Sequence, residues 1–552
     1  MTAVMTALTG TVELTRFILL RDRIRILVWI VAIVALAALT ATGIKGLFPT
    51  QAALDQTAAA TQHNAAAIAF NGPAQGLNTV GGQVAFQFGA GGMVLVALMS
   101  LFMVGRLTRG EEEAGRLELM RSLPVGSLAP TLAASLTVAA MNIAVGVLTT
   151  VALLAQGLPA AGSLVFGVSF ILIGLVFGGV ALVVAQVTEN TRVVYGAAGA
   201  VLGASFVLRA VGDIGDGTVS WFSPIGWAQK ARPFAGERWW PLLLLLTATV
   251  VLVAAASSPA ARRDLGAGLV AARPGRPTAS RSLGHPFGLA IRLQRGVLLG
   301  WSVGVLVTGI AYGWIGPTVD AFIGQNKALA EILAGAGGAS LTDSYFAASF
   351  RFMALIATGF AIQSTLRLRS EETSMRAESV LATPVSRWRW GASHLTVAFA
   401  GSVILLGVGG LATGLTYGVA GGDLNSGPRL VGAALVYAPP MWLMVGLTVA
   451  LVGLVPRWAG ASWAILAACV VAGFLGAVLH LPSWLQNLSP FERVPQLPAQ
   501  SLALLPLVVI SAVALMPGRR PSTGCIGSAR TSKVRRSKSP VARVARHAAY
   551  CP

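Results

Sequence analysis

One short charged sequence occurs twice in this chain, and its residue types favour ion pairing on a helix surface. The first copy contains Glu111, Glu112, Arg116 and Glu118, followed by Pro124. The second copy contains Glu371, Glu372, Arg376 and Glu378, followed by Pro384, each 260 positions further on. A Glu four residues before an Arg is a favourable helical pair, so the sequence predicts pairs from Glu112 to Arg116 and from Glu372 to Arg376.

Each copy therefore predicts a short charged helix that begins with acids and is limited at its far end by a proline. Apolar residues such as Leu117 lie among the charges. Such a helix can dock in a cleft of a partner protein, with the charges setting its orientation. A solvated loop that only carries basic residues is the alternative, but such a loop has no need to repeat a pattern of acids.

The composition shows what kind of molecule must present these helices. Of the 552 residues, 55% are hydrophobic and 11% are charged, and the mean hydropathy is +0.73. Soluble domains carry about 25% charged residues, so lipid must solvate much of this chain. The formal net charge of +20 does not indicate nucleic-acid binding, because the bases flank apolar segments or lie in the last residues of the chain.

Twelve apolar segments are long enough to be membrane-spanning helices. They are expected at 26–44, 84–105, 131–154, 163–186, 193–210, 239–257, 297–315, 346–366, 394–417, 430–454, 461–480 and 501–516. Their continuous apolar character excludes the alternating strands of a barrel, and helices satisfy their own backbone in hydrocarbon. The predicted fold class is an all-α polytopic membrane protein.

The distribution of Lys and Arg predicts the orientation. With twelve spans, both termini, both charged segments and the central linker fall on one side, and all of them are basic. The positive-inside rule makes that side the cytoplasm, so we expect a multi-pass protein of the bacterial plasma membrane with both termini inside. Residues 211–238 are an exception, since Lys230, Arg232 and Arg238 would lie outside. Either this region is a re-entrant hairpin or the fifth and sixth spans are misplaced.

The duplication predicts two parallel-repeated six-helix halves. A second repeat supports it, because Ser223-Pro224 and Ser489-Pro490 each precede the last span of a half. The expected organisation is a first half at 1–257, a cytoplasmic linker with an amphipathic helix at 258–296, a second half at 297–517, and a basic disordered tail at 518–552.

The charged segments "EEEAGRLELMRSLPVGS" and "EETSMRAESVLATPVSRWRWG" resemble the cytoplasmic segment of ABC-2 type transporter permeases. The twelve-helix layout resembles the fused bacterial exporters of polyketide antibiotics, the tetronasin-resistance type. The resemblance covers nearly the whole chain up to about residue 517. It implies export of a hydrophobic small molecule, an antibiotic or drug, by a permease that is not itself an enzyme.

The resemblance also implies a partner and roles for particular residues. The duplicated acids and arginines and their prolines would lie in or beside coupling helices, at 106–130 and 367–391, that bind two copies of an ABC ATPase subunit. ATP and Mg would be bound by that subunit, with no cofactor in this chain. An amphipathic helix would lie on the membrane before each half, near 8–24 and 282–295, and the Ser-Pro pairs would belong to an extracellular re-entrant region.

Two other classes of protein remain as alternatives. The chain has no GxxxxGK[ST] loop for ATP phosphates, so an ion gradient could supply the energy, as in twelve-helix secondary transporters. Such carriers usually need carboxylates within the membrane, and the interiors of the predicted spans have none. A membrane enzyme would need an acid–base cluster. Asp213 and Asp216 are the only candidates, and loop Asp residues among glycines more often form turns.

Residues that could contact a transported molecule lie in the second and eighth spans. They are Phe86, Gln87, Phe88, Arg351 and Gln363. Packing against lipid or neighbouring helices is the more common role for such side chains, and Arg351 could instead line an outer vestibule. The glycine series at Gly296, Gly300 and Gly304, and at Gly410, Gly414 and Gly418, predicts close helix contacts. The scattered His and Cys residues give no metal site.

Overall fold

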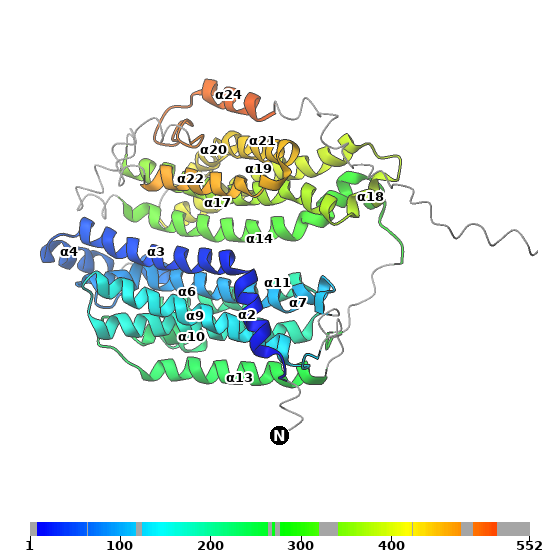
Figure 1. Cartoon of the computed structure of the whole chain (residues 1–552). Coiled ribbons are helices and arrows are strands. Elements are labelled where there is room, and N and C mark those ends of the chain that lie inside the picture. The colour runs from blue at the N-terminus through cyan, green and yellow to red at the C-terminus, as the bar shows by residue number, and fades with distance from the viewer. Residues whose placement is uncertain are drawn as a thin grey trace, which may run out of the picture. The chain divides into compact units, whose positions relative to one another are not determined.

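The protein is described by a computed structural model (Figure 1) that places residues 8–62, 65–117, 124–262, 268–270, 277–319, 340–421, 423–475 and 489–515. These residues form helices, turns and loops, with no β-strand in any of these ranges. The chain divides into two compact units, Met1–Pro277 and Thr278–Pro552. The boundary falls inside the stretch that the sequence predicts as a linker.

The first unit contains six long helices with shorter ones between them. Its elements are α2 (Thr11–Arg21), α3 (Arg23–Leu47), α4 (Gln51–Thr61), α5 (Ala65–Asn71), α6 (Val80–Leu107), α7 (Arg109–Glu113), α9 (Ala129–Ala155), α10 (Ala160–Val187), α11 (Thr191–Ile214), the 3₁₀ turn η1 (Val219–Phe222), α12 (Pro224–Lys230) and α13 (Trp240–Arg262).

The second unit has the same order of long helices. Its elements are η2 (Arg281–Gly284), α14 (Pro286–Ile315), η3 (Gly316–Thr318), α17 (Leu341–Thr373), α18 (Arg376–Leu381), α19 (Arg387–Val419), η4 (Leu424–Ser426), α20 (Gly427–Leu435), α21 (Ala438–Leu454), η5 (Pro456–Trp458), α22 (Ala461–Leu475) and α24 (Leu504–Leu515).

The prediction of an all-α polytopic membrane protein is confirmed. Among the described residues, ten helices are long and apolar enough to cross a membrane, and α22 and α24 are shorter apolar helices. Together they account for the twelve predicted segments. The end of the predicted segment 461–480, the last residue of 501–516 and the basic tail 518–552 lie outside the described residues.

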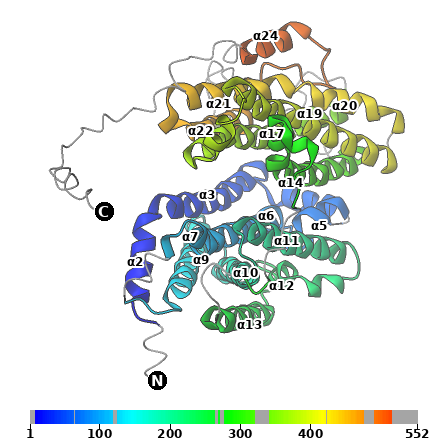
Figure 2. The ribbon, with the colours of Figure 1, turned by 90° about the vertical axis from the view of Figure 1, so that its right-hand side faces the viewer.

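Both units pack their helices in the same pattern. In the first, α3 contacts α6 and α9, α10 contacts α6, α9, α11 and α13, and α11 contacts α6. In the second, α14 contacts α17 and α19, α21 contacts α17, α19, α22 and α24, and α22 contacts α17. Figure 2 shows α10 among α6, α9, α12 and α13. The charge repeat in the sequence is thus accompanied by a repeat of helix packing within each unit.

Small residues set the closest helix contacts, but not all of the predicted ones. A Cβ on Gly309 or Gly313 of α14 would lie 2.6 Å from the Gly409 carbonyl oxygen or 2.3 Å from that of Thr413, so α14 and α19 approach through their backbones. Gly410 and Gly414 likewise face α20, as predicted. Gly296, Gly300 and Gly304 make no close helix contact within the second unit, because none of its described atoms lies within 4 Å of their Cβ positions.

The helix before the first span is separate, whereas the one expected before the second half is not. α2 ends at Arg21, and α3 starts at Arg23 after a break at Asp22, where Figure 1 shows the chain turning sharply. The expected helix at 282–295 is instead the start of α14, which runs without interruption from Pro286 into the span. The prediction of a distinct amphipathic helix there is wrong, since no residue after Pro286 interrupts the helical backbone.

Candidate functional site

The first charged segment (106–130) begins where α6 ends. α6 stops at Leu107, Thr108 has a non-helical backbone, and the five residues of α7 follow. After α7 the chain turns at Gly115, whose φ of +68° is in the left-handed region that glycine adopts without strain. The backbone N–H of Gly115 donates to the Glu112 carbonyl at 2.9 Å, which closes the end of the helix.

The second charged segment (367–391) has the same turn at the matching position. α17 runs without a break to Thr373, and Met375 then adopts a φ of +59°. Its N–H donates to the Glu372 carbonyl at 3.0 Å, which matches the bond made by Gly115. A left-handed conformation is uncommon for a residue with a side chain. The two turns therefore share one backbone geometry although only one of them has the favourable residue.

This turn changes which glutamate each arginine meets. Arg116 donates from Nε to Oε2 of Glu111 at 2.6 Å and from Nη2 to Oε1 at 3.2 Å. Arg376 makes the same two bonds to Glu371, at 2.9 and 3.4 Å. The predicted pairs from Glu112 and Glu372 are wrong, because the helix ends before the arginine. The left-handed residue then turns the arginine back over the first glutamate of the segment.

In the first unit, Glu111 belongs to a larger network of ion pairs. Arg21, the last residue of α2, also donates to Glu111, at 3.0 Å. The neighbouring carboxylate of Asp22 accepts from Arg21, from Arg25 at 2.8 Å and from Arg106 at 2.8 Å. Both carboxylates are buried, with Asp22 4% and Glu111 4% exposed. Ion pairs therefore join α2, α3, α6 and α7 in one cluster.

In the second unit, Glu371 makes only local ion pairs among the described residues. It accepts from Arg367 of the same helix at 2.7 Å and from Arg376 across the turn. Near the start of α14, buried Gln294 lies 3.2 Å from Nδ1 of His394 and accepts a hydrogen bond from Ser364. Among the described residues, Glu371 forms no ion pair with an arginine of α14.

The first charged segment is also attached to the next connection between spans. Arg109 is fully buried, donates from Nε to the Ala185 carbonyl at 2.5 Å at the end of α10, and pairs with Glu112 at 2.6 Å. Glu113 accepts from the backbone N–H of Thr191 at 2.6 Å, at the start of α11, where a carboxylate is favoured by the helix dipole. These bonds fix α7 against the ends of α10 and α11.

Several charged groups remain on the surface of the two segments. Arg116 and Arg376 keep about half of their side chains exposed, at 52% and 56%. Glu372, Glu378, Pro124 and Pro384 are also exposed, while Glu118 lies outside the described residues. Each segment thus combines a buried glutamate that shapes the turn with exposed charges that a partner protein can reach.

The carboxyl group of Asp22 illustrates the electrostatics of the network. Burial acts to raise its pKa, but the hydrogen bonds and charges of Arg21 and Arg106 outweigh this and hold the pKa below the usual value. In the same network, the hydrogen bond from Arg116 to Glu111 raises the pKa of Arg116. Asp22 and Arg116 therefore stay charged across the physiological range.

The predicted pathway residues are divided between the two units, and they have different surroundings within each unit. In the first unit, Phe88 packs against Phe170 in the core, with ring centroids 5.9 Å apart, and Gln87 is exposed. In the second, Gln363 is exposed and accepts from Trp301 at 2.9 Å. Arg351 forms a pair with Glu492 at 2.7 Å. Their role in transport stays a prediction.

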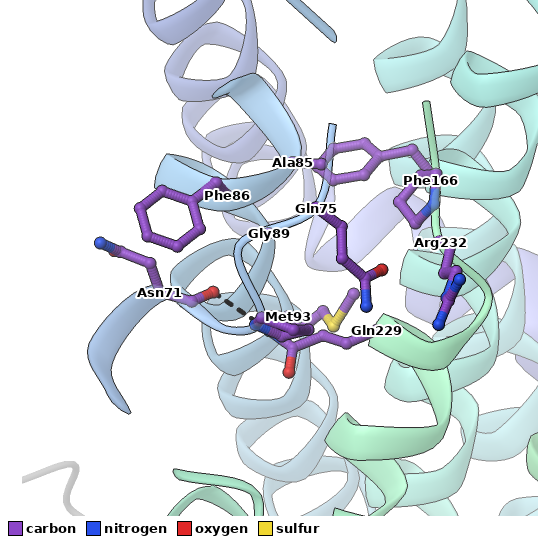
Figure 3. A pocket seen from close by; sticks show the side chains of 11 residues that line it. Asn71, Gln75, Ala85, Phe86, Gly89, Met93, Phe166, Gln229 and Arg232 are labelled. Atoms are coloured by element: carbon purple, nitrogen blue, oxygen red, sulfur yellow. Dashed lines mark hydrogen bonds between the residues drawn. The ribbon is translucent and has the colours of Figure 1, made fainter. Parts of the chain in front are cut away.

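Phe86 differs from these residues because it lines a cavity within the first unit (Figure 3). The cavity volume is about 30 Å³, and its walls include Met93, Phe166, Gln75 and Arg232. Gln229 closes one side by donating to the Asn71 carbonyl at 3.1 Å, as the dashed line in Figure 3 shows. This volume is far below the several hundred Å³ of pockets that hold small organic molecules, so the cavity does not test whether Phe86 contacts a transported molecule.

Two features of the charged chemistry were not predicted from the sequence. Asp22 was not singled out, although an acid flanked by Arg21, Arg23 and Arg25 is a signal for an ion-pair centre. The second is Asp213: the predicted fifth span ends at 210, but α11 continues to Ile214 and includes this acid. Asp213 lies 3.5 Å from the fully buried Arg209 and accepts from Ser220. The fifth span was therefore drawn too short, and this acid lies at the end of α11 rather than in its interior.

Comparison with known proteins identifies the family. The chain is 40% identical over 510 residues to the multidrug efflux system permease protein Rv1217c of Mycobacterium tuberculosis (strain ATCC 25618 / H37Rv), covering 92% of each chain. Residues 283–517 match the family model described as the C-terminal domain of the multidrug efflux system permease Rv1217c. The chain belongs to the Rv1217c family of permeases.

Membership of the Rv1217c family agrees with the resemblance to ABC-2 type permeases found in the charged segments. The matched region 283–517 contains all of the second charged segment and the helices α14 to α24. Rv1217c-family permeases are transport proteins, which agrees with a chain made of membrane-spanning helices.

Proposed function

We propose that this chain is the membrane-spanning permease of an ATP-driven exporter of hydrophobic drugs, and that its two charged segments bind two copies of a separate ABC ATPase. Its relative is named as a multidrug efflux permease, which supports drugs as the transported class. The ATPase must be a separate chain, because no Walker loop is present in this sequence. Transport then depends on contact between the charged segments and the ATPase.

The observation that carries this proposal is the repeated turn. Both charged segments end a helix with a left-handed residue and hold an arginine on a buried glutamate by two hydrogen bonds. A structural loop has no reason to conserve this geometry in both units while the residue at the turn differs. A rigid turn that occurs once in each unit suits a partner that binds twice, such as a pair of identical ATPase subunits.

The helices connect the turn of each charged segment to the membrane-spanning part of its unit. α17 is one continuous helix from Leu341 to Thr373, so a force on the turn of the second charged segment moves the eighth span directly. In the first unit, Arg109 and Glu113 fix α7 to the ends of α10 and α11. Closure of the ATPases on ATP would therefore displace α17 in one unit and a bundle of three helices in the other.

A double charge reversal tests the coupling. Glu112→Lys with Glu372→Lys keeps the glutamates that shape the turns. It reverses Glu112, whose side chain is 10% exposed and pairs with the buried Arg109, and Glu372, which is exposed. We expect drug-stimulated ATP hydrolysis by the reconstituted permease–ATPase complex to fall at least tenfold. Asp55→Lys is the matched control, because Asp55 is also an exposed acid but lies on α4, outside both segments.

The comparison between these variants decides the proposal. The double variant must still insert and elute as a monodisperse protein, and the control must keep normal hydrolysis. Normal drug-stimulated hydrolysis in the double variant would contradict coupling through these segments. Drug uptake into ATPase-free proteoliposomes driven by a proton gradient would contradict ATP as the energy source and favour the secondary-transporter alternative.

The proposed orientation places both charged segments and both termini in the cytoplasm, which follows from the distribution of bases. The described part of the chain contains one buried cysteine, Cys469, so a new cysteine can report on access. In a variant with the three natural cysteines replaced, Ser379→Cys is expected to react with a membrane-impermeant maleimide only in opened cells. Labelling in intact cells would reverse the orientation and exclude a cytoplasmic ATPase at this segment.

A further inference from the structure

A recess in the first unit lies beside the first charged segment and has no role in the proposed contact with an ATPase. It encloses about 420 Å³, within the range of ligand pockets. Its walls include three arginines and three aromatic residues: Arg25, Arg106, Arg116, Trp29, Phe102 and Tyr195. These residues come from the ends of α3, α6 and α11 and from the turn after α7.

Positive charges outnumber negative charges around the recess. Four arginines (21, 25, 106 and 116) share two carboxylates, Asp22 and Glu111. Two positive charges therefore remain without a neutralising acid in this cluster. A guanidinium has five N–H donors, and Arg25 and Arg106 each direct one terminal nitrogen to Asp22. The Nε of Arg106 is buried and has no acceptor among the described residues.

The arginines are held in place before any ligand arrives. Asp22 and Glu111 are buried, and each accepts several charge-assisted hydrogen bonds. Such bonds fix the guanidinium planes and lower the entropy that a ligand would have to remove. Planar guanidinium groups match the oxygen atoms of phosphate and carboxylate. The recess is therefore suited to an anion that can accept from more than one arginine.

The remaining wall is apolar and well packed. The rings of Phe102 and Tyr195 meet edge to face at 5.3 Å, and Tyr195 donates to the Phe102 carbonyl at 3.3 Å. A Cβ on Gly105 would lie 2.3 Å from the Tyr195 ring, so only glycine lets the ring pack this closely on α6. Trp29 extends the same aromatic surface along α3. Water makes few favourable contacts with this apolar wall, whereas a hydrocarbon chain would bury its own apolar surface against the wall.

We propose that this recess binds the anionic head group of an amphiphile, with phosphate or carboxylate oxygens on Arg25 and Arg106 and the hydrocarbon chain along Phe102 and Tyr195. A phospholipid of the membrane and a free anionic amphiphile both have this chemistry. The second unit lacks the charges, since Gln294 and Val297 precede Trp301 where Asp22 and Arg25 precede Trp29, and Leu366 stands 260 positions after Arg106. Within the described residues, the proposed site therefore belongs to the first unit.

Binding to the purified full-length chain tests this without any ATPase or nucleotide, so the result is independent of the proposed function. The probes are phosphatidylglycerol, added to protein in uncharged detergent and counted by native mass spectrometry, and dodecyl phosphate, titrated calorimetrically. Arg25→Gln and Arg106→Gln are expected to weaken the tightest binding of at least one probe about tenfold. Arg23→Gln is the matched control, because Arg23 is an exposed arginine in the first turn of α3 that does not line the recess.

The pattern across probes identifies the source of the ligand. If the arginine variants weaken binding of phosphatidylglycerol alone, the recess is a lipid site. If they weaken binding of dodecyl phosphate alone, it binds a free amphiphile. Weaker binding of both probes supports the shared chemistry. Phe102→Ala should weaken dodecyl phosphate about fivefold, and inorganic phosphate should bind far more weakly than dodecyl phosphate. Arg25 is exposed, so its variant is expected to fold even if Arg106→Gln does not.

Two results would overturn the proposal. If Arg25→Gln binds both probes as tightly as Arg23→Gln does, the arginines of the recess do not hold an anion. If inorganic phosphate binds as tightly as dodecyl phosphate, the aromatic wall does not contribute. Either result would leave the recess as a packing feature of the first unit.

Discussion

The two charged segments share a backbone turn but differ in what surrounds it. Around Glu111, ion pairs reach to α2, α3 and α6 through Arg21, Asp22 and Arg106. Around Glu371, they stay within the end of α17 and the turn that follows. The comparison teaches that the turn is the duplicated feature, whereas the network behind it belongs to the first unit.

This difference has a mechanical consequence. In the first unit, a displacement of the charged segment is transmitted by charged hydrogen bonds to the helix that precedes the first span. In the second, it is transmitted by the continuous backbone of α17. We therefore expect substitutions of buried acids to act over a longer range in the first unit than in the second.

The largest expected effect is at the centre of the ion-pair network. Asp22→Asn keeps the shape but leaves Arg25 and Arg106 without a counter-charge and Arg21 with Glu111 alone, which should lower the free energy of unfolding by about 3 kcal/mol. Gln294→Leu, at the corresponding place seven residues before a Trp, removes only neutral hydrogen bonds and should cost about 1 kcal/mol. Unfolding of the purified protein in mixed micelles by added SDS measures both. Equal losses of unfolding free energy in the two variants would contradict the difference between the two units.

A smaller effect is expected when the shared glutamate is neutralised. Glu111→Gln weakens bonds to Arg21 and Arg116 and should cost about 2 kcal/mol, against about 1 kcal/mol for Glu371→Gln, whose partners are local and partly exposed. Hydrogen exchange distinguishes them further. Backbone amides of α2 should exchange faster in Glu111→Gln, while Glu371→Gln should change exchange only near residues 367–381. No change in α2 would show that Arg21 does not hold it.

The turn residues should respond with opposite signs. Gly115→Ala forces an alanine into the left-handed region and should lower the free energy of unfolding by about 1 kcal/mol. Met375→Gly relieves the same conformation and should raise it by about 0.5 kcal/mol after the entropy of the unfolded glycine is included. The Met375 side chain is 62% exposed, so little packing is lost. A loss of stability in both variants would mean that side-chain contacts outweigh the backbone.

The smallest effect appears only in acid. The pKa of Asp22 is lowered in the folded protein, so its contribution is fully present above the unfolded pKa of about 3.9. The contribution is lost as the pH falls below that value through the folded pKa. Between pH 5 and 8, unfolding should therefore show no step from Asp22. From pH 5 to pH 3, the wild type should lose more stability than Asp22→Asn, and an identical loss would contradict the paired carboxylate.

Sequence reasoning predicted the spans well and the ion pairs poorly, for separate reasons. The segment 84–105 lies within α6 because its apolar character alone requires a helix in lipid. The pairing of Glu112 with Arg116 was wrong because it assumed that the helix continues beyond Glu113. Asp22 was missed because Arg106, one of its partners, lies 84 positions away and only folding brings it near.

The predicted boundary of the fifth span shows the same limit. Hydropathy ended it at 210, before Asp213, but the acid is accommodated in α11 by Arg209 and Ser220. A charge counts against a span when it is alone, and a partner removes much of that cost. Whether a partner is present depends on the packing of α11 against the residues that follow it, which no single segment reveals.

By itself, the sequence determined that this protein is a bundle of membrane helices built from two related units, because lipid acts on each segment separately and apolar length is a local property. It also determined that a charged segment occurs in each unit. Only the tertiary structure decided which glutamate each arginine meets and that Asp22 joins α2, α3 and α6. Those outcomes depend on where helices end and how they pack, because an ion pair needs two groups within about 4 Å and sequence distance does not measure that separation.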